Sequence, residues 1–197
     1  MEIRAVGAGA LGDLDELFGS SNITRGCHCM WFLLTSKEAE AGWRGGNRER
    51  FGRLAAEETR PMGVLAYDDE GRPVGWCAAG PRSRYARALR SPILAAHDPA
   101  EDDDVWLVPC FFVRVGARRA GTTGLLLAAA VEQAERHGAT AVEGFPLAGT
   151  GPHRDDRYLG TEPLFAACGF RAVARPSGRR VVMRRDLGAG CRAGPRG

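Results

Sequence analysis

The sequence has no hydrophobic run long enough to cross a membrane. No stretch approaches the roughly 18 consecutive apolar residues that a transmembrane helix needs, although 44% of the 197 residues are hydrophobic. That share is typical of a globular chain and argues against a disordered one. The first residues lack the basic-then-apolar order of a secretory signal. We therefore expect a cytoplasmic protein that makes no contact with a membrane.

The chain has only a small excess of charge of one sign, and it has almost no lysine. The chain has 27 basic and 24 acidic residues, a net charge of +3, and Lys37 is its one lysine among many arginines. This balance does not indicate nucleic-acid binding. We attribute the arginine excess to codon usage. Because a guanidinium forms a fork that suits phosphate oxygens, the positions of single arginines still matter.

A metal-binding pattern is missing as well. Cys27-His28-Cys29 is the only close group among the six cysteines, and no second pair follows at zinc-ribbon spacing. In a chain of this size and expected location, buried thiols are more typical than disulfides. We predict that the protein holds no metal.

The hydrophobic pattern predicts one α/β domain over residues 1–187, followed by a disordered tail over 188–197. The N-terminal part, 1–62, is mainly helical, and a hairpin of two strands opens the core, 63–187. The run over 105–113 is almost wholly apolar, which favours a strand buried on both faces. We expect further strands over 2–6, 63–67, 73–79, 141–145, 171–175 and 181–185. We expect helices over 11–18, 48–59, 125–136 and 162–168, and another helix that starts at residue 37.

The most informative segment joins the strand over 105–113 to the helix over 125–136. Its sequence, Gly116 to Gly124, reads GARRAGTTG. The first turn of a helix presents unpaired N–H groups and a positive dipole end, both of which favour phosphate. Gly121 lets the backbone approach a ligand closely. Neither GxxxxGK[ST] nor GxGxxG occurs, so the residues alone leave an ordinary strand-to-helix turn open.

A family resemblance favours the anion site. Arg118-Arg119-Ala120-Gly121-Thr122-Thr123 resembles the Q/R-x-x-G-x-G/A pyrophosphate loop of the GCN5-related N-acetyltransferases (GNAT). The order of elements around it is similar too. Leu164-Phe165-Ala166-Ala167-Cys168-Gly169-Phe170 resembles the family's L-Y-x-x-x-G-F segment. The resemblance covers about 63–187 and implies a mixed central sheet, flanked by helices, whose middle strands splay apart.

The resemblance also implies an acyl-CoA donor, with acetyl-CoA the first choice, as co-substrate. In the family, backbone groups at the end of the long strand pair with the pantetheine arm, and the loop holds the pyrophosphate. Carried over to this sequence, the strand residues are Phe111, Phe112, Val113 and Arg114. The loop residues are Arg118, Arg119, Ala120, Gly121, Thr122, Thr123 and Gly124.

Two residues depart from the family pattern. Thr123 stands where the family has glycine or alanine, and it adds a hydroxyl that either bonds a phosphate oxygen or crowds it. Phe165 stands where many members place a tyrosine that protonates the departing thiolate. Tyr158, in the preceding loop, is the only nearby phenol, and we predict that it supplies the acid. The alternatives are that water supplies the proton or that no acid is needed.

For the general base we select Glu143, because its position mid-strand predicts burial, which raises a carboxyl pKa. The alternative is a strand glutamate paired with an arginine. Cys110 as an acylated nucleophile competes with Cys110 as a small buried hydrophobe. His153 as a general base or substrate contact competes with His153 as a solvent-exposed loop histidine.

The region over 1–62 covers the acceptor site by resemblance. We predict that Cys29, Trp31 and Tyr85 line an acceptor pocket, with core packing as the alternative. The predicted activity is N-acyl transfer to a small primary amine by direct attack on the thioester, in a monomer or homodimer. Two alternatives stay open: a GNAT-fold transferase with an aminoacyl-tRNA donor, and a catalytically degenerate CoA-binding module.

Overall fold

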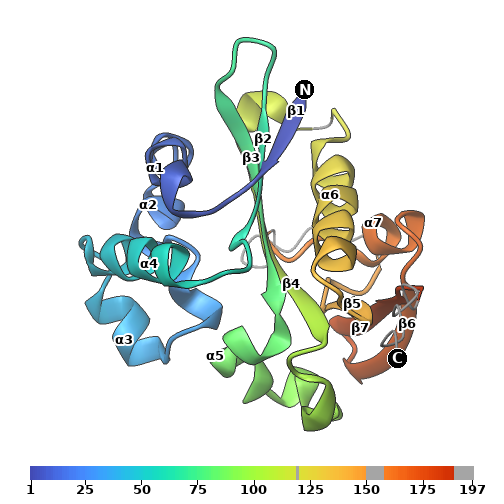
Figure 1. The fold of residues 1–197 in the computed structure, drawn as a ribbon. Coiled ribbons are helices and arrows are strands. Elements are labelled where there is room, and N and C mark those ends of the chain that lie inside the picture. The colour runs from blue at the N-terminus through green and yellow to red at the C-terminus, as the bar shows by residue number, and fades with distance from the viewer. Residues whose placement is uncertain (119, 150–157, 189–197) are drawn as a thin grey trace, which may run out of the picture.

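The structure is a computed structural model, and it describes residues 1–118, 120–149 and 158–188. At its centre is a seven-stranded sheet with the order β1-β2-β3-β4-β5-β7-β6 (Figure 1). Neighbouring strands are antiparallel except β4 and β5, which are parallel. The predicted single α/β domain with a mixed sheet is confirmed. The strands are β1 (Glu2–Ala5), β2 (Gly63–Tyr67), β3 (Pro73–Pro81), β4 (Val105–Val113), β5 (Ala141–Gly144), β6 (Arg171–Ser177) and β7 (Arg180–Asp186).

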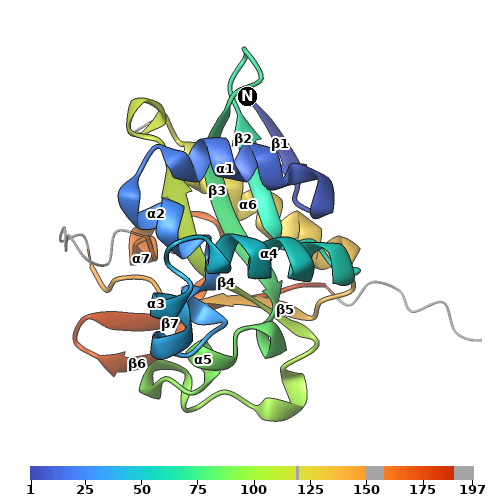
Figure 2. The ribbon, with the colours of Figure 1, turned by 90° about the vertical axis from the view of Figure 1, so that its left-hand side faces the viewer.

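Helices cover both faces of the sheet. Figures 1 and 2 show α1 to α4 on one face and α6 and α7 on the other. Among the described helices, none combines the length and the apolar character that crossing a bilayer requires. The predicted tail lies outside the described residues except for Gly188. The helices are α1 (Leu11–Gly19), α2 (Asn22–Cys27), α3 (Ser36–Ala41), α4 (Gly46–Glu57), α5 (Ala86–Leu89), α6 (Thr122–Arg136) and α7 (Glu162–Ala167).

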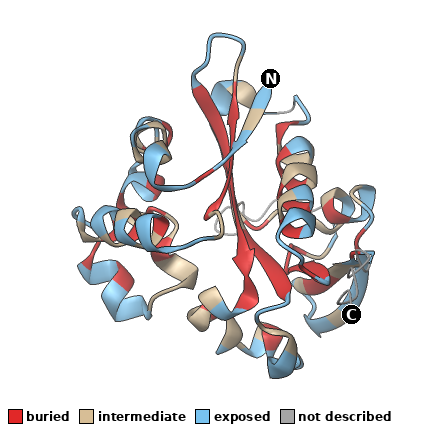
Figure 3. Ribbon diagram, in the orientation of Figure 1, coloured by how far each residue is buried: buried red, intermediate tan, exposed pale blue. Residues whose placement is uncertain are grey.

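The central strands are buried on both faces, as Figure 3 shows in red. Because side chains alternate along a strand, Val64 and Ala66 of β2 join the core beneath α6, while Leu65 and Tyr67 join the core beneath the N-terminal helices. In β4, eight of nine residues are buried and Cys110 is half-buried. The prediction of a doubly covered strand over 105–113 is therefore confirmed.

The two middle strands separate partway along their length. β4 and β5 pair only from Val105 with Ala141 to Val108 with Gly144. Gly144 ends β5, but β4 continues to Val113. Beyond the paired part, the Phe111 N–H donates to the Tyr158 carbonyl at 2.6 Å. This separation is the splay that the resemblance implies, and it exposes one edge of β4 to the loop after β5.

Local differences from the predicted elements have identifiable causes. α6 begins at Thr122, three residues earlier than expected, because Gly121 takes the left-handed conformation (φ 75°) that starts the helix. α2 was not predicted. Thr35 caps α3: its side chain and that of Glu38 form a reciprocal capping box.

Candidate functional site

A groove of about 220 Å³ lies beside the end of β4 and the start of α6. We call it the donor groove. It brings together strand and loop residues that the resemblance assigned to the donor, and it adds two residues from the loop after β5. Its lining residues are Phe111, Phe112, Val113, Arg118, Thr123, Tyr158 and Gly160.

The loop before α6 places Arg118 and the first turn of the helix beside this groove. The Thr122 hydroxyl is buried and donates to the Ala117 carbonyl at 3.0 Å, which closes the loop. Thr123 is half-buried and faces the groove. Arg118 Nε donates to the Val113 carbonyl at 2.9 Å, so the guanidinium is held along the groove. The unpaired N–H groups of the first helical turn and this guanidinium together suit a phosphate group.

Not every predicted donor residue faces the groove. The Arg114 N–H donates to Val74 at 2.9 Å, and its guanidinium contacts Glu16 at 3.4 Å. Both groups are therefore engaged with other elements, which argues against a donor contact for Arg114. Ala120 and Gly121 are exposed ahead of α6. Arg119 lies outside the described residues, as does His153.

A larger cavity of about 440 Å³ lies between the N-terminal helices and the separated strands. We call it the apolar chamber. It shares Phe112 and Tyr158 with the donor groove, so the two spaces meet at these residues. In the described part of the chain, no carboxylate lines it. Its lining residues are Phe18, Ile23, Thr24, Cys27, Cys29, Trp31, Phe32, Trp43, Ile93, Cys110, Phe112, Phe145, Tyr158, Leu159 and Arg180.

The wall of the chamber contains strained backbone. His28 (φ 42°) and Cys29 (φ 55°) are the only non-glycine residues with positive φ in the described chain. Each such conformation costs on the order of 1–3 kcal/mol unless surrounding contacts enforce it. Here His28 contacts Asp15 at 3.1 Å and the Arg25 carbonyl at 2.8 Å, and Trp76 Nε1 donates to Cys29 Sγ at 2.9 Å. These contacts fix the Cys29 side chain at the chamber wall.

Three thiols face the chamber: Cys27, Cys29 and Cys110. Burial raises the pKa of Cys27 to about 11. A hydrogen bond with Cys29, followed by burial, raises the pKa of Cys110 well above its usual range. A protonated thiol is a poor nucleophile, so the geometry favours Cys110 as a hydrophobe rather than an acylated nucleophile. Within residues 1–118, 120–149 and 158–188, no cluster of three or more potential ligands could hold a metal ion.

We expect Cys27 and Cys110 to alkylate slowly at neutral pH. A pKa of about 11 for Cys27, against an ordinary 8.5, lowers the thiolate fraction at pH 7.5 by roughly 100-fold or more. The measurement is iodoacetamide labelling followed by peptide mass spectrometry, with free glutathione as the reference. Labelling of Cys27 and Cys110 should rise steeply toward pH 10. Reaction at the glutathione rate at pH 7.5 would contradict the raised pKa.

Tyr158 is the phenol at the junction of donor groove and chamber. Its ring lies 6.3 Å from that of Phe112, and its carbonyl holds the Phe111 N–H. Phe165 is fully buried, with its ring 5.0 Å from that of Phe170 and 6.0 Å from that of Phe111. Because Phe165 has no hydroxyl, Tyr158 is the nearest candidate for an acid that protonates a departing thiolate.

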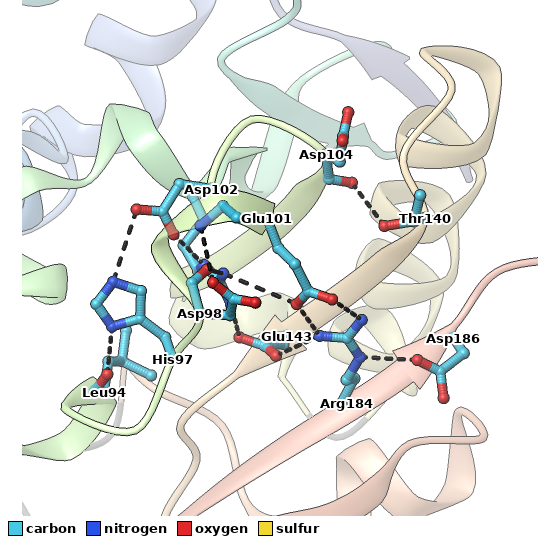
Figure 4. A network of polar contacts seen from close by, with 12 residues as sticks. Leu94, His97, Asp98, Glu101, Asp102, Asp104, Thr140, Glu143, Arg184 and Asp186 are labelled. Carbon is cyan, nitrogen blue, oxygen red and sulfur yellow. Dashed lines mark hydrogen bonds and ion pairs between the residues drawn. The ribbon is translucent and has the colours of Figure 1, made fainter.

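Glu143 lies elsewhere, in a buried network of charges (Figure 4). Only 5% of it is exposed. Arg82 Nη1 donates to its Oε2 at 2.8 Å, and Arg184 Nη1 donates to its Oε1 at 3.0 Å. It lines neither the donor groove nor the chamber but a separate hollow with Arg82 and His97. Burial was correctly predicted; the two arginines favour the alternative, an ion-paired strand glutamate, over a general base.

The three predicted acceptor residues have different positions. Cys29 and Trp31 line the chamber, and their contact with an acceptor stays a prediction. Tyr85 does not: it is 2% exposed and packs in a core cluster with Leu107 and Val182. The prediction that Tyr85 contacts an acceptor is therefore not supported, because core packing leaves its ring no access to the chamber.

Several chamber residues were not predicted. Ile23 belongs to the unpredicted α2, and Trp43 to a glycine-rich stretch with a weak helical pattern. The indole of Trp43 occupies the space where a side chain on Gly26 would lie. Gly26, inside a short helix, was the one local signal that a large ring packs there.

Comparison with known proteins identifies the fold. No protein-family model matches the chain, and neither does any curated protein. Solved structures do. An acetyltransferase of the GNAT family from Streptococcus pneumoniae is similar with a TM-score of 0.55 and 12% identity, over 94% of this chain and 99% of that one. The GNAT domain of S. lividans PAT gives 0.54 and 15%, over 94% and 89%.

A third similar structure is the paia N-acetyltransferase from Thermoplasma acidophilum in complex with coenzyme A, with a TM-score of 0.51 and 12% identity, over 94% of this chain and 98% of that one. At these identities the likeness concerns the fold. The chain therefore has the fold of the GCN5-related N-acetyltransferases, which confirms the fold expected from the loop and strand order.

Proposed function

We propose that this chain is an N-acyltransferase that uses acyl-CoA, with acetyl-CoA as the first donor to test, and a small primary amine as acceptor. The observation that carries the proposal is the meeting of the donor groove and the apolar chamber at Phe112 and Tyr158. There a thioester and an amine, entering from opposite sides, would come together at the separated strands. Holding two reactants in this way supplies much of the rate enhancement in direct acyl transfer.

The groove residues suit such a donor. Arg118 and the first turn of α6 would hold the pyrophosphate, with the Thr123 hydroxyl beside them. Acyl-CoA would supply the activated thioester. The amine nitrogen would bond to the acyl carbon, the carbon–sulfur bond would break, and Tyr158 would give the sulfur a proton and regain one from water. Because no described carboxylate lines the chamber, we assign the amine's proton to water rather than to Glu143.

A CoA-binding module without turnover is the second candidate. Phe165 lacks the hydroxyl expected of an acid, and Glu143 is held by two arginines, so both observations favour it. It differs from the first candidate in one measurable respect: it binds CoA but forms no acylated amine. An aminoacyl-tRNA donor stays a prediction, and salt-dependent tRNA binding without a response to CoA would be its signature.

We expect acetyl-CoA to bind saturably and Arg118→Met to weaken that binding about 10- to 100-fold, the effect of losing a hydrogen bond to a charged group. Isothermal titration calorimetry measures the binding. Arg136→Met, an exposed arginine at the other end of α6, is the matched control and should bind normally. Absence of binding at millimolar acetyl-CoA would overturn the proposal that acetyl-CoA is the acyl donor.

Turnover needs a separate readout. Because the chain carries six cysteines, thiol reagents would report protein thiols as well as released CoA. Acetylated product should therefore be detected directly by mass spectrometry over a panel of primary amines. Product formation supports the transferase, and binding without product supports the non-catalytic module.

A further inference from the structure

A smaller cavity of about 190 Å³ lies next to the apolar chamber. We call it the side pocket. The two share Trp31, Phe32, Ile93 and Phe145. The donor groove joins the chamber at a different set of residues, Phe112 and Tyr158. The three spaces thus lie next to one another in the order donor groove, chamber and side pocket. The side pocket is lined by Trp31, Phe32, Arg87, Ala88, Ser91, Ile93, Leu94 and Phe145.

Arg87 is the charged residue of the side pocket. Its guanidinium carbon lies 3.7 Å from the centre of the Trp31 ring, which fixes the guanidinium against an aromatic wall. Its Nη1 is buried and has no hydrogen-bond partner, and no described residue accepts a hydrogen bond from the rest of the group. Arg82 and Arg84, nearby in sequence, each donate to carboxylate and carbonyl oxygens.

A buried N–H group without an acceptor is costly, because it has lost water and gained nothing in return, and at Arg87 this applies to Nη1. The Trp31 ring compensates only in part. In the described part of the chain, no acidic side chain lines the side pocket. Ser91 adds a second donor: its oxygen accepts from the Ile93 N–H at 3.3 Å, which leaves the hydroxyl hydrogen free to point at a ligand. The side pocket thus holds one cationic group, Arg87, and no described anionic group to pair with it.

We propose that the side pocket binds the anionic end of the acceptor. The acceptor is then an amine on a flat apolar body, with a carboxylate at the end remote from the amine. Arg87 pairs with the carboxylate through its fork, the aromatic residues of the chamber cover the body, and the amine reaches the donor groove. This inference rests on the proposed function for the amine end only; binding of the anion does not depend on it.

The test uses two amines that differ only at the far end: 4-(aminomethyl)benzoate and 4-methylbenzylamine. Binding is measured by calorimetry in the presence of CoA, and acetylation by mass spectrometry with acetyl-CoA. We expect the carboxylate compound to bind at least tenfold more tightly. In Arg87→Met this preference should disappear, while 4-methylbenzylamine binds as before. Arg90→Met, an exposed arginine at the end of α5, is the matched control and should keep the preference.

The outcomes separate the two proposals. Arg87-dependent binding of the carboxylate compound, with no acetylated product from it or from the amine panel, supports the side pocket and overturns the transferase. Acetylation of both amines with equal efficiency overturns the side pocket and leaves the transferase standing. Failure of both amines to bind also overturns the side pocket. If Arg87→Met does not fold, Arg87→Lys and Ser91→Ala serve instead, and unchanged preference in both would overturn the assignment.

Discussion

Replacing Arg82 by methionine is expected to lower the free energy of unfolding by about 3–5 kcal/mol, because it breaks a buried ion pair and leaves its partners uncompensated. Arg82 is 1% exposed. Its Nε donates to Asp102 at 2.7 Å, its Nη1 to Glu143 at 2.8 Å and its Nη2 to the Asp98 carbonyl at 2.6 Å. One side chain thus connects the segment before α5, the loop ahead of β4, and β5.

Urea denaturation of the purified protein measures the loss. Arg72→Met is the matched control: Arg72 also contacts two carboxylates, Asp68 and Glu70, but its side chain is 61% exposed. Exposed pairs contribute about 0–1 kcal/mol, so this variant should unfold almost as the parent does. Equal losses in the two variants would show that burial of the Arg82 network contributes nothing.

A double variant tests whether the network acts as one unit. Glu143→Gln removes the charge that Arg82→Met leaves unpaired, although Arg184 still contacts that position. Contacting residues do not have additive effects, so R82M combined with E143Q should lose less stability than the two single variants together. Strict additivity would contradict the direct pairing.

The sequence predicted the sheet well because its signals there are local. The apolar run over 105–113 became β4 with the same bounds. The acidic turn between the runs at 63–67 and 73–79 became the β2–β3 hairpin, in which Gly71 takes φ 78°. Each of these patterns depends on neighbours in the chain, where periodicity and turn residues carry the information.

The site was less predictable because its contacts are not local. The prediction for Glu143 correctly included burial, but its arginine partners lie 61 and 41 positions away. Arg82 and Arg87 both lie in the long connection between β3 and β4, away from the apolar runs that predicted the strands. Trp43 enters the chamber only because Gly26 leaves room for its ring. Pairings of this kind depend on tertiary structure, which a single sequence does not show.

Replacing Tyr158 by phenylalanine is expected to lower kcat about 100-fold or more, the usual contribution of a general acid. The structure offers no other phenol at the junction, because Tyr67 and Tyr85 are buried in the core and Phe165 has no hydroxyl. Acetyl-CoA affinity and stability should be nearly unchanged, because the contact that Tyr158 makes with Phe111 comes from its backbone carbonyl and persists in the variant.

Glu143→Gln is the matched comparison. If Glu143 serves only its two arginines, this variant should lose stability yet keep kcat within a few-fold of the parent, the reverse of Y158F. Steady-state kinetics at saturating acetyl-CoA, with urea denaturation of the same preparations, gives both quantities. A normal kcat in Y158F, together with a 100-fold lower kcat in a folded E143Q, would assign the proton transfer to Glu143. The proton path would then run through the buried charge network instead of the junction of groove and chamber.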